Sequence, residues 1–449
     1  MILSHKLSGS KSGCNFKIFR LLFLATIQTV LSADESLIDA IKTSSISGYL
    51  KTMYIQDDRK GTKLDQTTFG LGGKVALTTG EYRSFRGSVA YYKTDDLGLR
   101  TKNPKETDAY MFDVDKKPYT VMGEAFVEYK YGNTKLKFGR QEIDTPFIST
   151  YDYRIIPNLF EAYTLTNQVI KDTTITVAYV AKMSGLDGVV SFKDFESMSE
   201  QTYTSLMLDE NNKIDTGYDI INVSKISSHQ GVVVIGLAKE GSPRFQIWNY
   251  YCKDVLNGTY ADIAYTSSLD KANSITFEGQ AYSITEIGKF KDFLSKLGLN
   301  GSYNLYGAKI TSDNKEVGTQ VSAAYNRFTG NDKTVTVFGN WGGYPEYVGI
   351  PFLFAEHNNP SPLANAGMFK VSLKYDMSRL GLGDSASVGY TIIDTDKKII
   401  QDTDIKMLSA TYKIKFGKNI SAKALYELRN SKNYRYDNDT LTLSLNYGF

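Results

Sequence analysis

The last nine residues, Leu441-Thr-Leu-Ser-Leu-Asn-Tyr-Gly-Phe449, decide the fold class. Large apolar side chains occupy every odd position of this stretch, and small or polar side chains occupy every even position. Because successive side chains of a β-strand point to opposite faces, the alternation predicts a strand with one apolar face and one polar face. Such a strand suits a membrane barrel with lipid outside and water inside, or, as the alternative, a soluble β-sandwich.

The same period of two recurs through most of the chain. Val75 and Leu77 alternate with Lys74 and Ala76, for example. Further strand-like runs cover residues 121–130, 174–181, 232–238, 275–283, 303–310, 321–328, 371–376 and 412–416. The mean hydropathy of −0.30 is compatible with a membrane barrel, because only alternate residues of each strand face lipid. No segment beyond the N-terminal region is apolar enough for a spanning helix, so a membrane protein of this pattern must be a closed barrel.

The connections between these runs are of two kinds. Short turns are predicted at 132–133, 382–384 and 417–419, where Gly, Asn and Asp gather. Two stretches are far longer and polar: residues 182–230, and residues 342–366 with four of the chain's 9 prolines. Outer-membrane barrels combine short periplasmic turns with long extracellular loops, some of which fold inward. We find no domain boundary.

The N-terminus is typical of an export signal. Four basic residues precede an apolar stretch from Leu21 to Leu31, which ends in the small residues Ser32 and Ala33. The stretch is too short to span a bilayer as a helix. We therefore expect residues 1–33 to be cleaved and residues 34–449 to form one transmembrane barrel. At about 22 to 26 residues for each strand with its turn, this length gives 18 strands, with 16 as the alternative.

The mature charge excludes a nucleic-acid partner. The chain has 52 Lys and Arg against 49 Asp and Glu, and the leader removes four of the bases and none of the acids. A nucleic-acid binder needs a net basic surface, which this balance does not supply. Of the two cysteines, Cys14 belongs to the leader, so Cys252 remains alone and no disulfide framework is possible.

Enzymatic motifs are missing from the sequence. His229 and His357 lie among polar loop residues without a partner at metal-ligand spacing, and no nucleophile elbow, Walker A loop or dinucleotide fingerprint occurs. His229 follows Ser227 and Ser228, which leaves a barrel hydrolase as a remote alternative. We therefore expect no enzyme activity, no cofactor and no metal.

A family resemblance adds to this picture. Phe138-Gly139-Arg140-Gln141, Asp144-Thr145-Pro146 and the run from Asp152 to Glu161 resemble the OprD-type porins, as do Gly80–Gly98 and Trp341-Gly342-Gly343. The resemblance implies an 18-stranded barrel, narrowed by inward-folded loops, that carries small nutrients past a ladder of basic side chains. The terminal Phe449 resembles the C-terminal signature of bacterial outer-membrane proteins, which implies recognition by the barrel-assembly machinery.

The resemblance also suggests pore-lining residues. Arg140 and Arg154 match arginines of the family motifs, and Lys51 and Lys423 stand where members often carry arginine. Parity independently predicts that Lys423 and Arg429 face the lumen. The candidate acids opposite them are Glu124, Glu128 and Glu161. The alternatives are that the lysines are ordinary solvated wall, and that the arginines form a structural ion-pair network with Gln141, Asp144, Asp152 and Glu161.

Two functions follow as hypotheses. The first is an outer-membrane porin for passive diffusion of small solutes and ions, such as carboxylates or amino acids, through a constricted charged lumen. The second is a surface adhesin or structural barrel with a plugged lumen. The expected partners are outer-membrane lipid, the assembly machinery through Phe449, and small solutes. A homotrimer is as compatible with the apolar outer face as a monomer.

Overall fold

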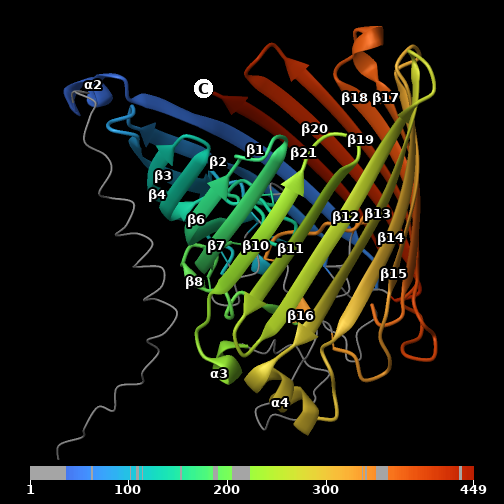
Figure 1. Cartoon of the computed structure of the whole chain (residues 1–449). Coiled ribbons are helices and arrows are strands. Elements are labelled where there is room, and N and C mark those ends of the chain that lie inside the picture. The colour runs from blue at the N-terminus through green and yellow to red at the C-terminus, as the bar shows by residue number, and fades with distance from the viewer. Residues whose placement is uncertain are drawn as a thin grey trace, which may run out of the picture.

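The chain forms a closed antiparallel β-barrel in a computed structural model. The structure describes residues 37–61, 64–101, 103–107, 111–113, 115–151, 154–185, 191–204, 223–335, 337–338, 341–349, 363–433 and 437–449. Within these residues, eighteen strands pair in chain order, and the last strand pairs with the first to close the ring (Figure 1). The predicted fold class and strand number are therefore confirmed. The predicted leader and His357 lie outside the described residues.

The strands of the wall have the following bounds: β1 Ser45–Arg59, β2 Gln66–Thr78, β3 Phe85–Asp95, β4 Thr120–Tyr131, β5 Thr134–Gln141, β6 Leu159–Asn167, β7 Thr173–Ser184, β10 Val232–Lys239, β11 Arg244–Cys252, β12 Leu256–Ser268, β13 Asn273–Glu286, β14 Tyr303–Asn314, β15 Thr319–Phe328, β17 Gly367–Asp376, β18 Ser385–Asp394, β19 Ile405–Phe416, β20 Ile420–Ser431 and β21 Asn438–Gly448. The loops add β8 Glu196–Ser197, β9 Tyr203–Thr204, β16 Val337–Phe338 and the helices α2 Leu37–Lys42, α3 Ser224–Ser227 and α4 Gly288–Lys296.

The two faces of the wall differ as the alternation predicts. In β2, Leu77 is 48% exposed on the outer face, whereas its neighbour Ala76 is 3% exposed on the inner face. In β21, Leu443 and Leu445 are likewise exposed, and Thr442, which directly precedes Leu443, is buried. The outer face is thus an apolar surface for lipid, and the inner face is enclosed by the barrel and its loops. None of the helices in the described part of the chain is long and apolar enough to span a bilayer.

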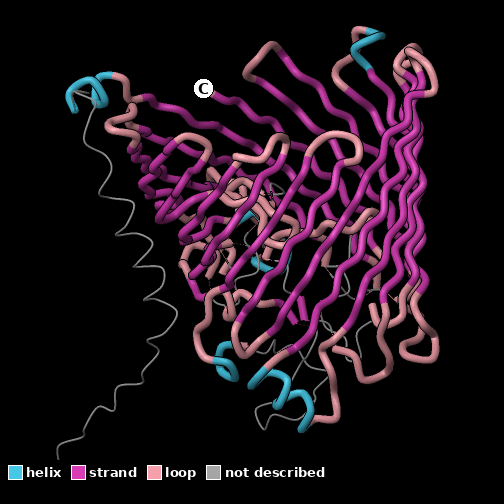
Figure 2. The backbone as a smooth tube through the Cα atoms, viewed as in Figure 1, coloured by secondary structure: helices cyan, strands magenta, loops and turns pink. Residues whose placement is uncertain are grey.

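The two ends of the barrel differ in their connections. At one end, which we call the turn rim, every connection is short, and the longest covers residues 377–384. The C-terminus and α2 lie at this end, and α3 and α4 lie at the opposite end, the loop rim (Figure 1). The long connections all start from the loop rim, and several fold back into the barrel (Figure 2). Short turns face the periplasm in outer-membrane barrels, so the loop rim faces outward.

Two connections differ from the sequence prediction. The turn placed at 382–384 covers 377–384, because the side chain of Asp376 accepts a hydrogen bond from the amide of Ser378 and caps a 3-10 turn over Met377–Leu380. At the loop rim, β11 and β12 are joined by only residues 253–255. Helix α4 covers this short connection, since the amide of Phe290 donates to the carbonyl of Asp254 at 3.0 Å.

Candidate functional site: a narrowed, charged lumen

The connection between β5 and β6 covers residues 142–158 and crosses the bore of the barrel, and we call it the crossing loop. At one wall, the hydroxyl of Tyr49 in β1 donates to the carbonyl of Ile155 at 2.8 Å. At the other, the ring of Phe147 packs edge-on against Tyr260 of β12, with centroids 5.9 Å apart. In the ring of strands that the structure describes, β1 and β12 lie nine strands apart in either direction. The crossing loop therefore contacts opposite walls.

Two glycines of β2 make room for the crossing loop. A Cβ added to Gly70 would lie 2.7 Å from Cδ1 of Ile155, and one added to Gly72 would lie 2.6 Å from its Cγ2. Both separations are far below van der Waals contact, so any side chain at either glycine would displace the loop. The wall of β2 is flat at this point, which lets Ile155 lie directly on the backbone.

Other inward segments fill the bore beside β1–β4. Met111 and Phe112 of the β3–β4 connection and Phe192 of the β7–β10 connection pack with Ile155 in one buried apolar cluster. The wall contributes Met53, Ile55, Ala76, Ala90, Tyr92 and Val121 to the same cluster. Pink loop segments are visible inside the strands in Figure 2. Because these segments occupy the side of β1–β4, the passage is narrowed toward the remaining wall.

Four basic residues lie on one unbroken line across that remaining wall. Direct cross-strand pairs join Arg244 to Ala264, Ala264 to Glu278, Glu278 to Lys309, Lys309 to Ala324, Ala324 to Lys370, Lys370 to Thr391, Thr391 to Met407 and Met407 to Arg429. We call Arg244, Lys309, Lys370 and Arg429 the basic row. Their neighbours along the strands, such as Phe245, Ile310 and Val371, are exposed on the outer face, so the basic row faces inward.

The basic row rises from one rim of the barrel to the other. Arg244 is the first residue of β11, beside the turn rim, whereas Arg429 lies near the end of β20, beside the loop rim. Barrel strands tilt by about 40°, so a line of direct partners climbs the wall as it passes round it. Sequence analysis predicted Arg429 but missed Arg244, Lys309 and Lys370. The alternation of side chains in the sequence indicates that these three residues face inward. Their alignment across neighbouring strands depends on the strand register, which the sequence alone does not give.

Acidic residues accompany the basic row near the turn rim. The Nζ of Lys309 lies 2.7 Å from a carboxylate oxygen of Glu278, and Arg244 lies 3.5 Å from Glu278 and 3.7 Å from Asp262. At the other end, Arg429 pairs with Glu427 at 2.7 Å. The wall thus presents positive charge with fixed counter-charges, an arrangement that selects and orients charged solutes.

A cavity of about 440 Å³ lies at the start of the basic row. Its lining includes Arg244, Asp262, the aromatic residues Trp248, Tyr260 and Tyr347, and Pro146 of the crossing loop. Gln246 and Tyr260 donate to one oxygen of Asp262, at 2.6 and 2.8 Å. The other oxygen accepts no hydrogen bond from the described residues. The cavity combines a guanidinium, a carboxylate and flat rings.

Arg140 and Glu161 form a loose pair away from the basic row. They are direct partners across β5 and β6, with 3.7 Å between the guanidinium and the carboxylate. The guanidinium also lies over the ring of Phe195 at 4.1 Å and donates to the carbonyl of Met122 at 3.1 Å. Arg140 therefore connects a loop of the bore to the wall. Of the predicted ion-pair network, the pair of Arg140 with Glu161 is present.

Arg154 and Lys51 lie beneath the loops of the bore. The side chain of Arg154 packs at 5.0 Å from the ring of Phe192, and the residue is only 2% exposed. Its Nε and Nη2 find no hydrogen-bond acceptor among the described residues, and Asp152 lies outside them. Lys51 is 8% exposed and donates to the carbonyl of Arg154 at 2.7 Å. The side chain of Lys51 therefore binds the crossing loop and is not an ordinary solvated lysine of the wall.

The predicted acids Glu124 and Glu128 are both buried on the inner face of β4. Glu124 forms an ion pair with Lys74 and accepts from the hydroxyl of Tyr92 at 2.5 Å. Glu128 pairs with Arg86 at 2.6 Å. A β-bulge at Ala90 and Tyr91 shifts the register here and turns Glu124 inward. Lys423, the last predicted base, pairs directly with Lys413 of β19 and Ser444 of β21.

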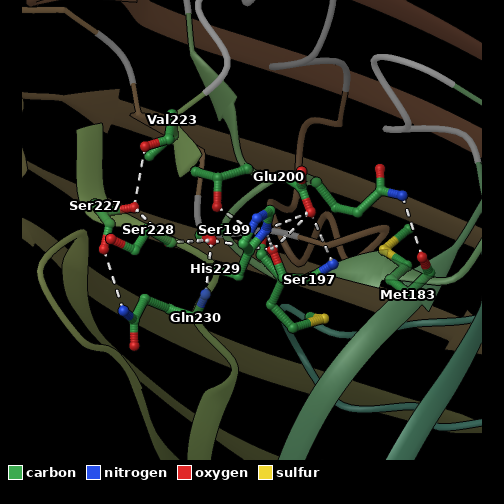
Figure 3. Close-up of polar contacts among 12 residues, drawn as sticks. Met183, Ser197, Ser199, Glu200, Val223, Ser227, Ser228, His229 and Gln230 are labelled. Atoms are coloured by element: carbon green, nitrogen blue, oxygen red, sulfur yellow. Dashed lines mark hydrogen bonds and ion pairs between the residues drawn. The ribbon is translucent and has the colours of Figure 1, made fainter. Parts of the chain in front are cut away.

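One serine, histidine and glutamate cluster lies at the loop rim (Figure 3). Ser197 donates to Glu200 at 2.9 Å, and the Nδ1 of His229 lies 3.0 Å from Glu200 and 3.5 Å from Ser197. Burial raises the pKa of Glu200, but hydrogen bonds from Ser197 and His229 outweigh it and keep the pKa below its ordinary value. A nucleophilic triad needs acid and serine on opposite ring nitrogens, whereas here both meet Nδ1.

The closed barrel, its lipid-facing wall and its charged, loop-narrowed interior are those of an outer-membrane channel. The family model described as "outer membrane porin, OprD family" matches residues 100–382. This chain belongs to the OprD family, and its place is the outer membrane. It is a porin, a channel for small solutes. A search of curated protein sequences found no match.

Solved structures of Pseudomonas aeruginosa porins share this fold. OccK9 (OpdG) has a TM-score of 0.70 and 17% identity, over 91% of this chain and 99% of its own. OpdK, solved with vanillate, has a TM-score of 0.69 and 12% identity over the same shares. OpdO has a TM-score of 0.67 and 17% identity, over 92% of this chain and 99% of its own. At such identities the likeness shows the fold alone.

Proposed function

We propose that this porin passes small carboxylates and zwitterions, such as amino acids, by passive diffusion along the basic row. The observation that carries the proposal is the unbroken inward line from Arg244 to Arg429, which runs from rim to rim. An anion that moves along the basic row always has another basic side chain ahead of it. It therefore never has to lose its full hydration shell without gaining a positively charged partner. The two lysines act as point charges, and the two arginines can hold a carboxylate through two parallel hydrogen bonds.

The cavity at the start of the basic row supports a preference for solutes with a ring. Arg244 can receive a carboxylate there, Asp262 can receive an amine, and Trp248 and Tyr260 offer flat apolar faces. OpdK, a structural relative, has been solved with vanillate, an aromatic carboxylate. We therefore include aromatic acids among the proposed solutes.

The residues predicted from the sequence keep a proposed role in the constriction. Arg140 with Glu161, and Glu124 with Glu128, supply charge along the loop-filled side of the bore, opposite the basic row. Lys51 and Arg154 act through the crossing loop that they hold. Lys423 adds positive charge to β20, below Arg429.

Liposome swelling tests the proposal. Vesicles containing the purified porin should swell faster in small carboxylates and amino acids than in neutral sugars of similar size. The double variant Lys309→Gln/Lys370→Gln should lose this preference while it continues to pass the sugars. The matched control is Lys271→Gln, which removes an exposed charge from a short turn. Equal rates for all solutes in the wild type would refute the preference, and no swelling at all would favour the plugged barrel.

Two partnerships belong to the proposal as well. The amides and carbonyls of Phe449 and Gly48 exchange two hydrogen bonds of 3.0 Å at the seam of the barrel, which supports recognition of the last strand by the barrel-assembly machinery. We propose a homotrimer as the alternative to a monomer, because the apolar outer face suits contact with a neighbouring subunit as well as with lipid. Chemical cross-linking in native outer membranes tests it, and the absence of a trimeric band would exclude it.

A further inference from the structure

Glu346 is a carboxyl group buried inside the bore. It lies on the β15–β17 connection, in the described segment 341–349, and is 6% exposed. One of its oxygens accepts a hydrogen bond from the hydroxyl of Tyr282 in β13 at 2.8 Å. The other oxygen is buried without a hydrogen-bond partner among the described residues. A buried carboxylate that accepts one hydrogen bond from another residue, with no cation beside it among the described residues, is unfavourable, so this site favours the neutral acid.

The segment around Glu346 is fastened to the wall at several points. The amide of Val348 donates to the side-chain oxygen of Asn326 at 2.8 Å. The carboxamide of Gln280, oriented to match its neighbours, donates to the carbonyl of Pro345 at 3.0 Å and accepts from the amide of Tyr347 at 2.9 Å. All of these bonds depend on the segment lying flat against β13 and β15. They would be lost together if Glu346 left its position.

The same segment holds the crossing loop. The amide of Gly343 donates to the carbonyl of Phe147 at 3.2 Å, and the amide of Ser149 donates to the carbonyl of Trp341 at 3.1 Å. The ring of Tyr282, which donates to Glu346, also packs edge-on against Phe147, with centroids 5.2 Å apart. Glu346 and the crossing loop therefore share one wall residue. A change at Glu346 acts on the narrow part of the passage.

The groups that face Glu346 are neutral in the physiological range. They are the hydroxyls of Tyr260, Tyr282 and Tyr303 from β12, β13 and β14, together with Tyr347 from its own segment. The charged residues nearby, Arg244, Asp262, Glu278 and Lys309, act on Tyr347. The crossing loop presents Phe147, and its charged Asp144 lines the cavity next to Pro345. Within the described residues, no cation compensates a charge on Glu346.

The direction of the pH effect follows from this burial. Burial raises the pKa of Glu346 to about 7, and the hydrogen bond from Tyr282 offsets it only in part. A docked carboxyl with a raised pKa binds its proton more tightly than a free one, whose pKa is about 4.3. The docking of segment 341–349 against the wall is therefore most favourable below the pKa of the free carboxyl. Between the free and the docked pKa, its equilibrium constant falls about tenfold per pH unit.

We propose that Glu346 is a proton-operated latch on the constriction. With the carboxyl protonated, segment 341–349 lies against the wall and holds the crossing loop across the bore. With the carboxyl ionised, the segment leaves the aromatic pocket, the bonds to Gly343 and Trp341 are lost, and the passage widens. The channel is narrower in acid and wider at mildly alkaline pH. This inference concerns conductance and does not depend on which solutes pass.

Single-channel recording across pH tests the latch. In planar bilayers, the open-channel conductance of the wild type should rise between about pH 4.5 and about pH 7.5, the range between the free and the docked pKa of Glu346. In Glu346→Gln the side chain has the shape of the protonated glutamate and is neutral at every pH. The conductance of this variant should therefore stay at the value that the wild type has in acid, across the whole pH range. His229→Gln, a substitution outside segment 341–349 and the crossing loop, should behave as the wild type. The same pH response in Glu346→Gln as in the wild type would overturn the proposal.

Cysteine labelling gives a second readout that does not alter Glu346. Val348 is fully buried beside the latch, and the native Cys252 is buried as well. In Val348→Cys, a water-soluble thiol reagent should label slowly in acid and at least tenfold faster at alkaline pH, after correction for the reactivity of a free thiol. Adding Glu346→Gln should abolish that difference. Equal corrected rates at both pH values would contradict a latch, even if the conductance varied.

Discussion

The carboxylate of Glu278 lies 2.7 Å from the ammonium of Lys309, its direct partner across β13 and β14. The same carboxylate lies 3.5 Å from the guanidinium of Arg244. The carboxylate of Glu278 therefore partly neutralises the positive charge of two of the four basic residues in the basic row. The selectivity of the channel should respond in opposite directions to removal of the acid and removal of a base.

Glu278→Gln should increase the preference for anions, because it leaves Lys309 and Arg244 without their shared counter-charge. Lys309→Gln should shift the preference toward cations. Each effect appears as a displacement of the reversal potential under a salt gradient, with opposite sign for the two variants. Displacements of the same sign, or none beyond that of the Lys271→Gln control, would show that these charges do not face the ion path.

Gly70→Val should disturb the crossing loop. Its Cβ would lie 2.7 Å from Cδ1 of Ile155, which costs about 1–3 kcal/mol of overpacking or displaces the loop. We expect a changed single-channel conductance together with earlier unfolding in urea. Gly279→Ala in β13 is the control, since the nearest atom to its Cβ lies at 3.8 Å. Wild-type conductance and stability in Gly70→Val would contradict the placement of Ile155.

Arg154→Ala should loosen the crossing loop more than it alters charge selectivity. The buried guanidinium packs on Phe192, a contact that contributes about 0.5–2 kcal/mol. Limited proteolysis of the folded barrel should cut the loop faster in this variant, while the reversal potential stays near that of the wild type. A large shift of the reversal potential toward cations would instead place Arg154 in the ion path.

Val388 and Ser387 are neighbours in β18 that face opposite sides of the wall. Val388→Lys places a charge in lipid and should destabilise the barrel by about 2–4 kcal/mol at mid-membrane depth. Ser387→Lys places the same charge inside and should be tolerated. Urea-induced unfolding of the barrel in lipid vesicles measures the free energy of unfolding of each variant. Equal losses of stability would mean that the two faces are wrongly assigned.

The alternation of side chains predicted the barrel because it is a local property. Leu443 and Leu445 lie on the outer face, as the spacing of two requires, and no distant residue is needed for that inference. The short turn at 132–133 was equally local. The turn at 382–384 was placed too narrowly, because its first half depends on a side-chain cap by Asp376.

The lumen could be predicted only in part, because it is made of contacts between distant residues. Lys309 and Lys370 each had inward parity, but only the pairing of both with Ala324 shows that they lie on one line. The crossing loop depends on Gly72 and Ile155, which lie far apart in the sequence. Arg154 has a matching motif, but its burial under Phe192 follows from a loop that no local pattern predicts.

The most direct test of the central claim is a planar-bilayer recording of the purified wild-type protein under a salt gradient. A water-filled passage lined by the basic row should give stepwise conductance, with a reversal potential on the anion-selective side. A bilayer that contains folded protein and shows no conductance steps, or steps with a cation-selective reversal potential, would contradict the account.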